Sequence, residues 1–155
     1  MATIRRRILE AVAAKLETAT GWVVRVRRIV EDLEPPKVAV VYSSTETKEQ
    51  RSGGCGEWTC NLSIDVAIDV DAAAVDPELD PYEVLDDAIA ELEAVLPADG
   101  DPAAAYGIAS LDDLRLVRTR MTAPTDEIGP VTAVLSLEAQ YRHDAQNPST
   151  WGGQP

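Results

Sequence analysis

The sequence predicts an α+β fold in which two helices pack on one face of a mostly antiparallel sheet, in the order α-β-β-β-α-β-β. From Trp58 to Val70 every even-numbered residue is apolar and the residues between them are polar or small, which is the period of a long strand with one buried face. Two other segments, near residues 4–18 and 81–96, repeat apolar residues with helical spacing. The 155 residues suffice for one domain with its own core.

The first forty residues predict a helix followed by two strands. Thr3 can cap the helix, which is expected to end near Thr18. Its apolar stripe consists of Ile4, Ile8, Leu9, Val12 and Leu16. Residues 22–30 are rich in β-branched side chains and predict the first strand. A proline-rich turn leads to the second strand, at residues 38–42.

Residues 44–56 are polar and end in a glycine-rich stretch, so we expect a long loop between two strands. Glycine gives such a loop conformational freedom, and the loop is expected to become ordered only against a binding partner. Four residues near its centre offer both signs of charge, and they are the candidate contacts with that partner: Lys48, Glu49, Gln50 and Arg51. A disordered spacer is the alternative interpretation.

The second half of the chain completes the fold. The expected elements are a connection over residues 71–81, a helix to Leu96, a loop over residues 97–107, and strands at residues 114–121 and 131–141. Together with the first half, they predict a single domain over residues 1–142. Residues 143–155 are expected to form a flexible C-terminal tail.

The net charge of −13 is unevenly distributed along the chain. Residues 31–101 carry three basic and nineteen acidic side chains, whereas residues 1–30 carry seven basic and two acidic ones. An acidic body argues against general nucleic-acid affinity, which depends on Lys and Arg. The surplus suits solubility, or a wall that repels DNA phosphates. No segment has the pattern of a secretory signal or a membrane span, so a reducing cytoplasm is expected.

The sequence contains no motif that carries catalytic or metal chemistry. His143 stands between charged residues near the chain end and is expected to be a surface histidine. Cys55 and Cys60 provide too few ligands for a structural zinc site, so Cys60 is expected on the buried strand face and Cys55 in the loop. Two Asp-Asp pairs, at residues 86–87 and 112–113, are expected to face solvent. We therefore expect no enzyme, cofactor or metal.

Six local strings carry a family resemblance. They are, in chain order, the helix Ile-Leu-Glu-Ala-Val-Ala-Ala-Lys-Leu (8–16), a Pro-led strand (36–42), a polar Thr/Glu segment (43–47), a Trp-led alternating strand (58–66), an acidic Asp/Pro turn with a helix (77–96), and Leu-Ser-Leu-Glu-Ala-Gln-Tyr (135–141). These strings resemble the tail terminator family of long-tailed bacteriophages, the minor tail protein U type of lambda-like phages. The chain departs from that pattern at Arg25 to Arg28 and in residues 145–155.

The resemblance implies a structural virion protein of the tail or neck, assembled in the host cytoplasm. Such proteins form a homohexameric ring that caps the tail tube, ends its polymerisation and presents a surface to the head. The implied partners are further copies of the chain, the major tail tube protein, and the head–tail connector or stopper protein. The expected loop over residues 44–56 is the candidate contact with the tail tube or the connector. Genomic DNA is implied only in transit through the lumen, and no membrane is involved. Another role in head–tail joining is compatible with the same resemblance.

A ring requires two different surfaces that fit one another, and segregated charge suits such an interface. The candidate interface residues are Arg25, Arg27, Arg28, Arg118 and Arg120 on one subunit and Asp65, Asp69 or Asp71 on the next. The alternative is that these residues form cross-strand pairs within one sheet. Two other functions also stay open: a monomeric domain that binds a small ligand or host protein in an apolar pocket, and a weak metal-assisted enzyme.

Overall fold

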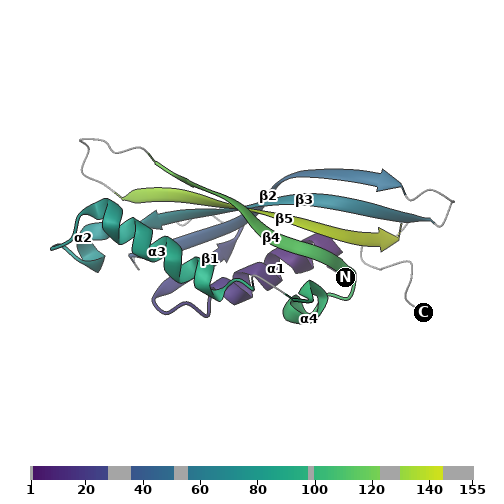
Figure 1. The fold of residues 1–155 in the computed structure, drawn as a ribbon, viewed down its shortest axis with the longest axis horizontal. Coiled ribbons are helices and arrows are strands. Elements are labelled where there is room, and N and C mark those ends of the chain that lie inside the picture. Colours follow the sequence, from purple (N-terminus) through teal and green to yellow (C-terminus); the bar gives the residue numbers. More distant parts are fainter. Residues whose placement is uncertain (1, 28–35, 51–55, 98–99, 123–129, 145–155) are drawn as a thin grey trace.

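The computed structural model describes residues 2–27, 36–50, 56–97, 100–122 and 130–144, apart from the side chain of Gln50. These residues form four helices and five strands (Figure 1). In chain order they are α1 (Ile4–Leu16), β1 (Trp22–Val26), β2 (Lys37–Gln50), β3 (Glu57–Val70), α2 (Ala72–Val75), α3 (Pro81–Val95), α4 (Pro102–Tyr106), β4 (Leu111–Met121) and β5 (Val131–Asp144). The predicted α+β class is confirmed.

The five strands form one sheet in the order β1-β2-β3-β5-β4. Only β1 and β2 are parallel, and the other three pairs are antiparallel, as the sequence predicts for most of the sheet. Figure 1 shows α1, α3 and α4 on the same side of this sheet. The predicted element order omits α2 and α4, which have four and five residues and are too short to show helical periodicity.

The two long helices begin where the sequence places their caps. The side chain of Thr3 accepts a hydrogen bond from the backbone N–H of Arg6, and that of Asp80 accepts one from Tyr82. Pro81 occupies the first turn of α3, where a backbone N–H has no acceptor within the helix, so the missing N–H of proline costs no hydrogen bond. Each helix then buries one apolar stripe against the sheet.

The centre of the core is the alternating strand β3. Its even-numbered residues from Cys60 to Val70 are at most 1% exposed, and they pack against the helices. The odd-numbered residues lie on the opposite face of the sheet, which we call the outer face, and Asn61 among them is exposed. The predicted long strand with one dry face is therefore confirmed.

The predicted loop over residues 44–56 is wrong in its first half. After an irregularity between Ser43 and Thr45, β2 continues to Gln50 in register with β3. Lys48 pairs with Cys60 and Glu49 with Thr59, so the candidate contact residues Lys48, Glu49 and Gln50 belong to a strand. The physical reason is that β3 is equally long and gives this polar segment a partner for its backbone groups. Arg51 lies outside the described residues.

The predicted boundary at residue 142 also requires correction. β5 runs to Asp144, because β3 begins at Glu57 and pairs with it there. His143 is consequently only 3% exposed, and its assignment as a surface histidine is wrong. Residues 145–155, which make up the rest of the expected tail, lie outside the described part of the chain.

Candidate functional site

The predicted interface residues lie on the outer face of the sheet. One row crosses all five strands and consists of Arg25, Val40, Ala67, Val134 and Arg120. The neighbouring row consists of Tyr42, Asp65, Ser136 and Arg118. Basic residues thus stand on the edge strands β1 and β4, and the acidic residues Asp65 and Asp69 stand on the central strand β3.

Within the described residues, the arginines of the outer face form no ion pair with the aspartates between them. Asp65 instead accepts a hydrogen bond of 2.8 Å from the hydroxyl of Ser136, which lies between it and Arg118. Burial raises the pKa of Asp69 above its ordinary value. Among these described residues, the cross-strand ion pairs that the sequence left open are therefore not formed.

The other predicted interface residues lie at the ends of β1 and β3 or beyond the described region. Arg27 follows β1 with a positive φ of 58°, and its backbone N–H donates to the carbonyl of Val41 at 2.9 Å. This backbone hydrogen bond follows directly after the last residue pair of β1 and β2. Arg28 lies outside the described residues. Asp71 caps the short helix α2 and stands at the end of β3.

The strand β4 forms one edge of the sheet, because it pairs only with β5. Three apolar side chains of β4 are exposed, with exposed fractions of 37% for Leu116, 46% for Val117 and 51% for Met121. A hollow of about 280 Å³ lies beside this strand at the end of α3. Its lining includes Leu96, Tyr106, Leu114, Leu116 and Leu137. Sequence reasoning missed this surface, since strand order decides which strand is an edge.

A second free edge lies at the other side of the sheet. The strand β1 covers β2 only from Lys37 to Val41, so residues 43–49 of β2 pair with β3 alone within the described part of the chain. Most of these residues are polar and exposed. We call residues 43–49 the β2 edge and residues 111–121 the β4 edge. The two edges differ in amino-acid composition and lie on opposite sides of the sheet.

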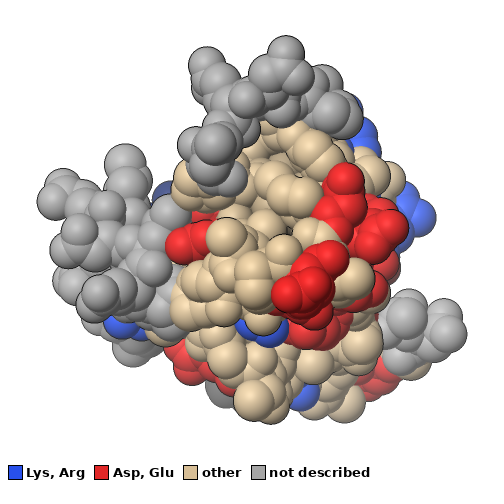
Figure 2. Space-filling model, turned by 90° about the vertical axis from the view of Figure 1, so that its left-hand side faces the viewer, with Lys and Arg blue, Asp and Glu red and all other residues tan. Residues whose placement is uncertain are grey.

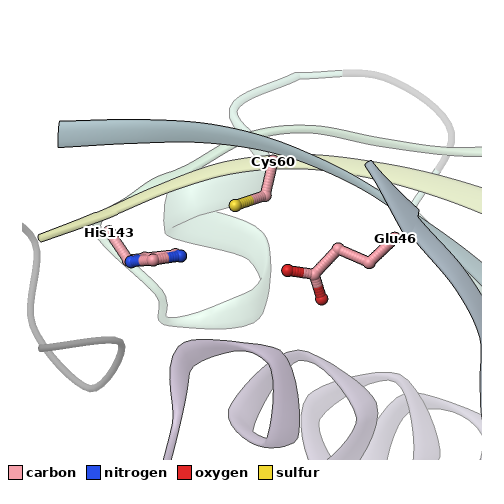
Figure 3. A group of neighbouring side chains, drawn as sticks. All are labelled: Glu46, Cys60 and His143. Atoms are coloured by element: carbon pink, nitrogen blue, oxygen red, sulfur yellow. The ribbon is translucent and has the colours of Figure 1, made fainter. Parts of the chain in front are cut away.

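A third feature is a cluster of polar side chains at the far end of the buried sheet face (Figure 3). The carboxylate of Glu46 accepts hydrogen bonds from Arg5 at 2.9 Å and from the hydroxyl of Tyr141 at 3.0 Å. The ammonium of Lys48 lies 3.5 Å from this carboxylate and 3.4 Å from Nε2 of His143. The predicted burial of Cys60 is confirmed, but the sequence does not reveal this cluster, because Glu46 and His143 have the pattern of a loop and a tail.

Burial and charge determine the ionisation of this cluster. Burial raises the pKa of the Cys60 thiol to about 11, and the carboxylate of Glu46 acts in the same direction. Burial alone would also raise the pKa of Glu46. The hydrogen bonds from Arg5 and Tyr141, together with the charges of Arg5 and Lys48, outweigh that effect and lower it. Glu46 is therefore ionised, and Cys60 is a neutral thiol, at neutral pH.

Acidic side chains gather at the end of the molecule that carries α2 and the start of α3 (Figure 2). Glu78, Asp80 and Glu83 are exposed there. The sequence has no Lys or Arg between Arg51 and Arg115, so nothing in that stretch of chain offsets this charge. The predicted solvent exposure of Asp86 and Asp87 is confirmed.

Comparison with protein-family models and with curated proteins finds no match for this chain. No helix in the described residues is long and apolar enough to cross a membrane.

Proposed function

We propose that this chain is a structural subunit that assembles head to tail with copies of itself. The observation that carries the proposal is the pair of different free edges on one sheet, β4 at one side and residues 43–49 of β2 at the other. A strand edge offers unpaired backbone N–H and C=O groups that a second strand can satisfy. Because the two edges are different, their pairing is heterologous, and such an interface closes into a ring when the rotation between subunits permits it.

Side chains at the β4 edge support this role. Leu116 is exposed and lines an apolar hollow, and strand addition commonly gains its specificity from such hollows. On the outer face, a shallow hollow of about 430 Å³ is lined by Asp65 and Arg118 among other residues. If β4 of a neighbouring subunit pairs with the β2 edge, the neighbour's Arg118 lies two strands away from Asp65. This arrangement brings basic and acidic residues of neighbouring subunits onto one continuous outer face.

Within this class, the resemblance described above favours a tail terminator. We propose that the ring caps a phage tail tube, ends its polymerisation and offers a surface to the head connector, with DNA passing through the lumen. The acidic end formed by α2 and the start of α3 suits a surface that repels phosphates. Glu49 is exposed on the β2 edge, so in this proposal it belongs to a subunit contact and not to a loop that reaches the tube.

The first test is the solution mass of the purified protein, by light scattering over a series of protein and salt concentrations. We expect a mass near that of six chains, or a monomer that forms a ring when tail tubes are added. Val117→Lys introduces a charge at the β4 edge and should reduce this mass. Val75→Lys is the matched control, because Val75 is also exposed, at 40%, but lies on α2.

The outcomes separate the proposed functions. If Val117→Lys and Val75→Lys assemble as well as the unmodified chain, the β4 edge is not the interface. A chain that stays monomeric at all concentrations and does not respond to tail tubes would contradict the ring and favour a small binding domain. Tight binding of duplex DNA by the ring at moderate salt would contradict a lumen through which DNA slides.

A further inference from the structure

Three strands bring metal-binding side chains together at one end of the buried sheet face. Glu46 on β2, Cys60 on β3 and His143 on β5 each offer one ligand atom, and these atoms all lie within 4.8 Å of one another. Figure 3 shows the three side chains pointing into a common space. Cys60 and His143 are 0% and 3% exposed, so their ligand atoms are shielded from water. Carboxylate, thiolate and imidazole are the ligand types that Zn²⁺ binds in proteins.

The ring of His143 is held in an orientation that suits a metal ligand. Its Nδ1 atom lies 2.6 Å from the backbone carbonyl oxygen of Asp144. Since a carbonyl oxygen only accepts hydrogen bonds, Nδ1 carries the proton and Nε2 presents a lone pair to the cluster. Metal-binding histidines commonly have this arrangement, in which a carbonyl fixes both the ring and its tautomer.

A cation already lies between two of these ligands. The ammonium of Lys48 is 3.4 Å from Nε2 of His143 and 3.5 Å from Oε1 of Glu46. The Lys48 side chain is 44% exposed, so it can turn into solvent without disturbing the core. Arg5 bonds to the other carboxylate oxygen, Oε2, at 2.9 Å, and this bond can persist while Oε1 binds a metal. The Tyr141 hydroxyl donates to Oε1 at 3.0 Å, and a carboxylate oxygen has a second lone pair for the metal.

We propose that Glu46, Cys60 and His143 bind a thiophilic divalent cation of the Zn²⁺ class, in the place of the Lys48 ammonium. On binding, the Cys60 thiol releases its proton to solvent, and the Lys48 side chain moves out with its charge unchanged. Ligand atoms lie about 2.0–2.3 Å from a bound Zn²⁺, so the three atoms must approach one another slightly. Three protein ligands leave a fourth position for water. The ion joins β2, β3 and β5 beside the β2 edge.

The test uses Co²⁺ as a spectroscopic substitute for Zn²⁺, with the full chain freed of tags and dialysed against chelator. We expect one Co²⁺ per chain, with a thiolate-to-cobalt charge-transfer band and tetrahedral visible bands, both removed by stoichiometric Zn²⁺. Lys48→Ala removes the competing ammonium and should tighten Co²⁺ binding about fivefold, given the repulsion expected between such close charges. Cys60→Ala and His143→Gln should weaken it at least about tenfold.

Cys55→Ser is the matched thiol control and should keep the charge-transfer band. If Cys55→Ser loses the band and Cys60→Ala keeps it, the ion binds elsewhere and the proposal fails. Co²⁺ binding without a charge-transfer band would identify surface carboxylates as the ligands and would also overturn it. If Cys60→Ala does not fold, Lys48→Ala still tests the site. The proposal is contradicted if neither the unmodified chain nor Lys48→Ala binds Co²⁺. None of these outcomes depends on ring assembly.

Discussion

Arg5 on α1 donates a 2.9 Å hydrogen bond to Glu46 on β2, and this bond ties the first helix to the far half of the sheet. The Glu46 side chain is only 9% exposed, so its charge needs a partner. Arg5→Ala leaves that carboxylate with Tyr141 and Lys48 alone, and it should lower the free energy of unfolding by about 1–3 kcal/mol. Urea unfolding followed by circular dichroism measures the change.

Arg6→Ala provides the control for this prediction. Arg6 forms a 2.9 Å ion pair with Glu10 along the same helix, but both side chains are largely exposed. Such a pair contributes at most about 0.5 kcal/mol. Equal losses in the two variants would show that the Arg5–Glu46 bond has no special part in stability.

A comparison of adjacent residues on β3 tests the two faces of the sheet. Leu62 is 1% exposed in the core, whereas its neighbour Asn61 points away from it and is exposed. Leu62→Ala should lower the free energy of unfolding by about 2–5 kcal/mol, because it removes buried methyl groups and leaves a cavity. Asn61→Ala should change it by less than about 0.5 kcal/mol. A large effect of Asn61→Ala on the free energy of unfolding would show that the outer face around Asn61 is packed against other atoms.

The pattern of β3 explains why most of the fold could be predicted from the sequence. Strict alternation between Trp58 and Val70 determines one strand and its buried face without any other information. The helix cap Thr3 and the start of the second long helix at Pro81 are equally local signals, and both are confirmed. These features can be predicted because each depends on a few neighbouring residues.

The failures concern features that depend on distant partners. Residues 44–50 are polar in the manner of a loop, and only pairing with the equally long β3 makes them a strand. His143 is buried for the same reason, through pairing with Trp58. The cluster of Glu46, Cys60 and His143 joins residues nearly a hundred positions apart, so it becomes visible only once strand order and register are known.

The contact of Glu91 with β1 and β2 predicts a dependence of stability on pH. Its Oε2 atom accepts hydrogen bonds from Lys37 at 2.7 Å and from the indole N–H of Trp22 at 2.9 Å. Partial burial alone would raise the pKa of Glu91, but these two bonds and the charge of Lys37 together lower it. The folded state therefore favours the ionised form, and its stabilising effect is present above the unfolded pKa of about 4.3.

Acidification removes this effect as the pH falls through the lowered pKa. The difference in free energy of unfolding between the unmodified chain and Glu91→Gln should shrink steadily from pH 6 to pH 3, values that bracket the unfolded pKa of about 4.3. Glu78→Gln is the control, because Glu78 is exposed and its side chain forms no ion pair within the described residues. A Glu91→Gln difference that does not change with pH would exclude a stabilising ionised Glu91.

Charge reversal at Arg118 tests the outer face as a subunit contact. Arg118 is exposed on β4, forms no ion pair within the described part of the chain, and lies in the same shallow hollow as Asp65. If a neighbour's Arg118 approaches Asp65, Arg118→Glu places two like charges at the contact and should weaken assembly about tenfold or more. Sedimentation velocity over a concentration series measures this change.

Arg7→Glu has the same change in charge on an exposed position of α1 and should leave the assembly constant within about twofold. The double variant Arg118→Glu with Asp65→Arg should recover part of the loss, since it restores opposite charges across the contact while reversing both. Recovery without any change in the far-ultraviolet circular dichroism would show that the charges of Arg118 and Asp65 act together in assembly. Equal weakening by Arg7→Glu would instead reflect net charge, and the outer face would then have no specific part in assembly.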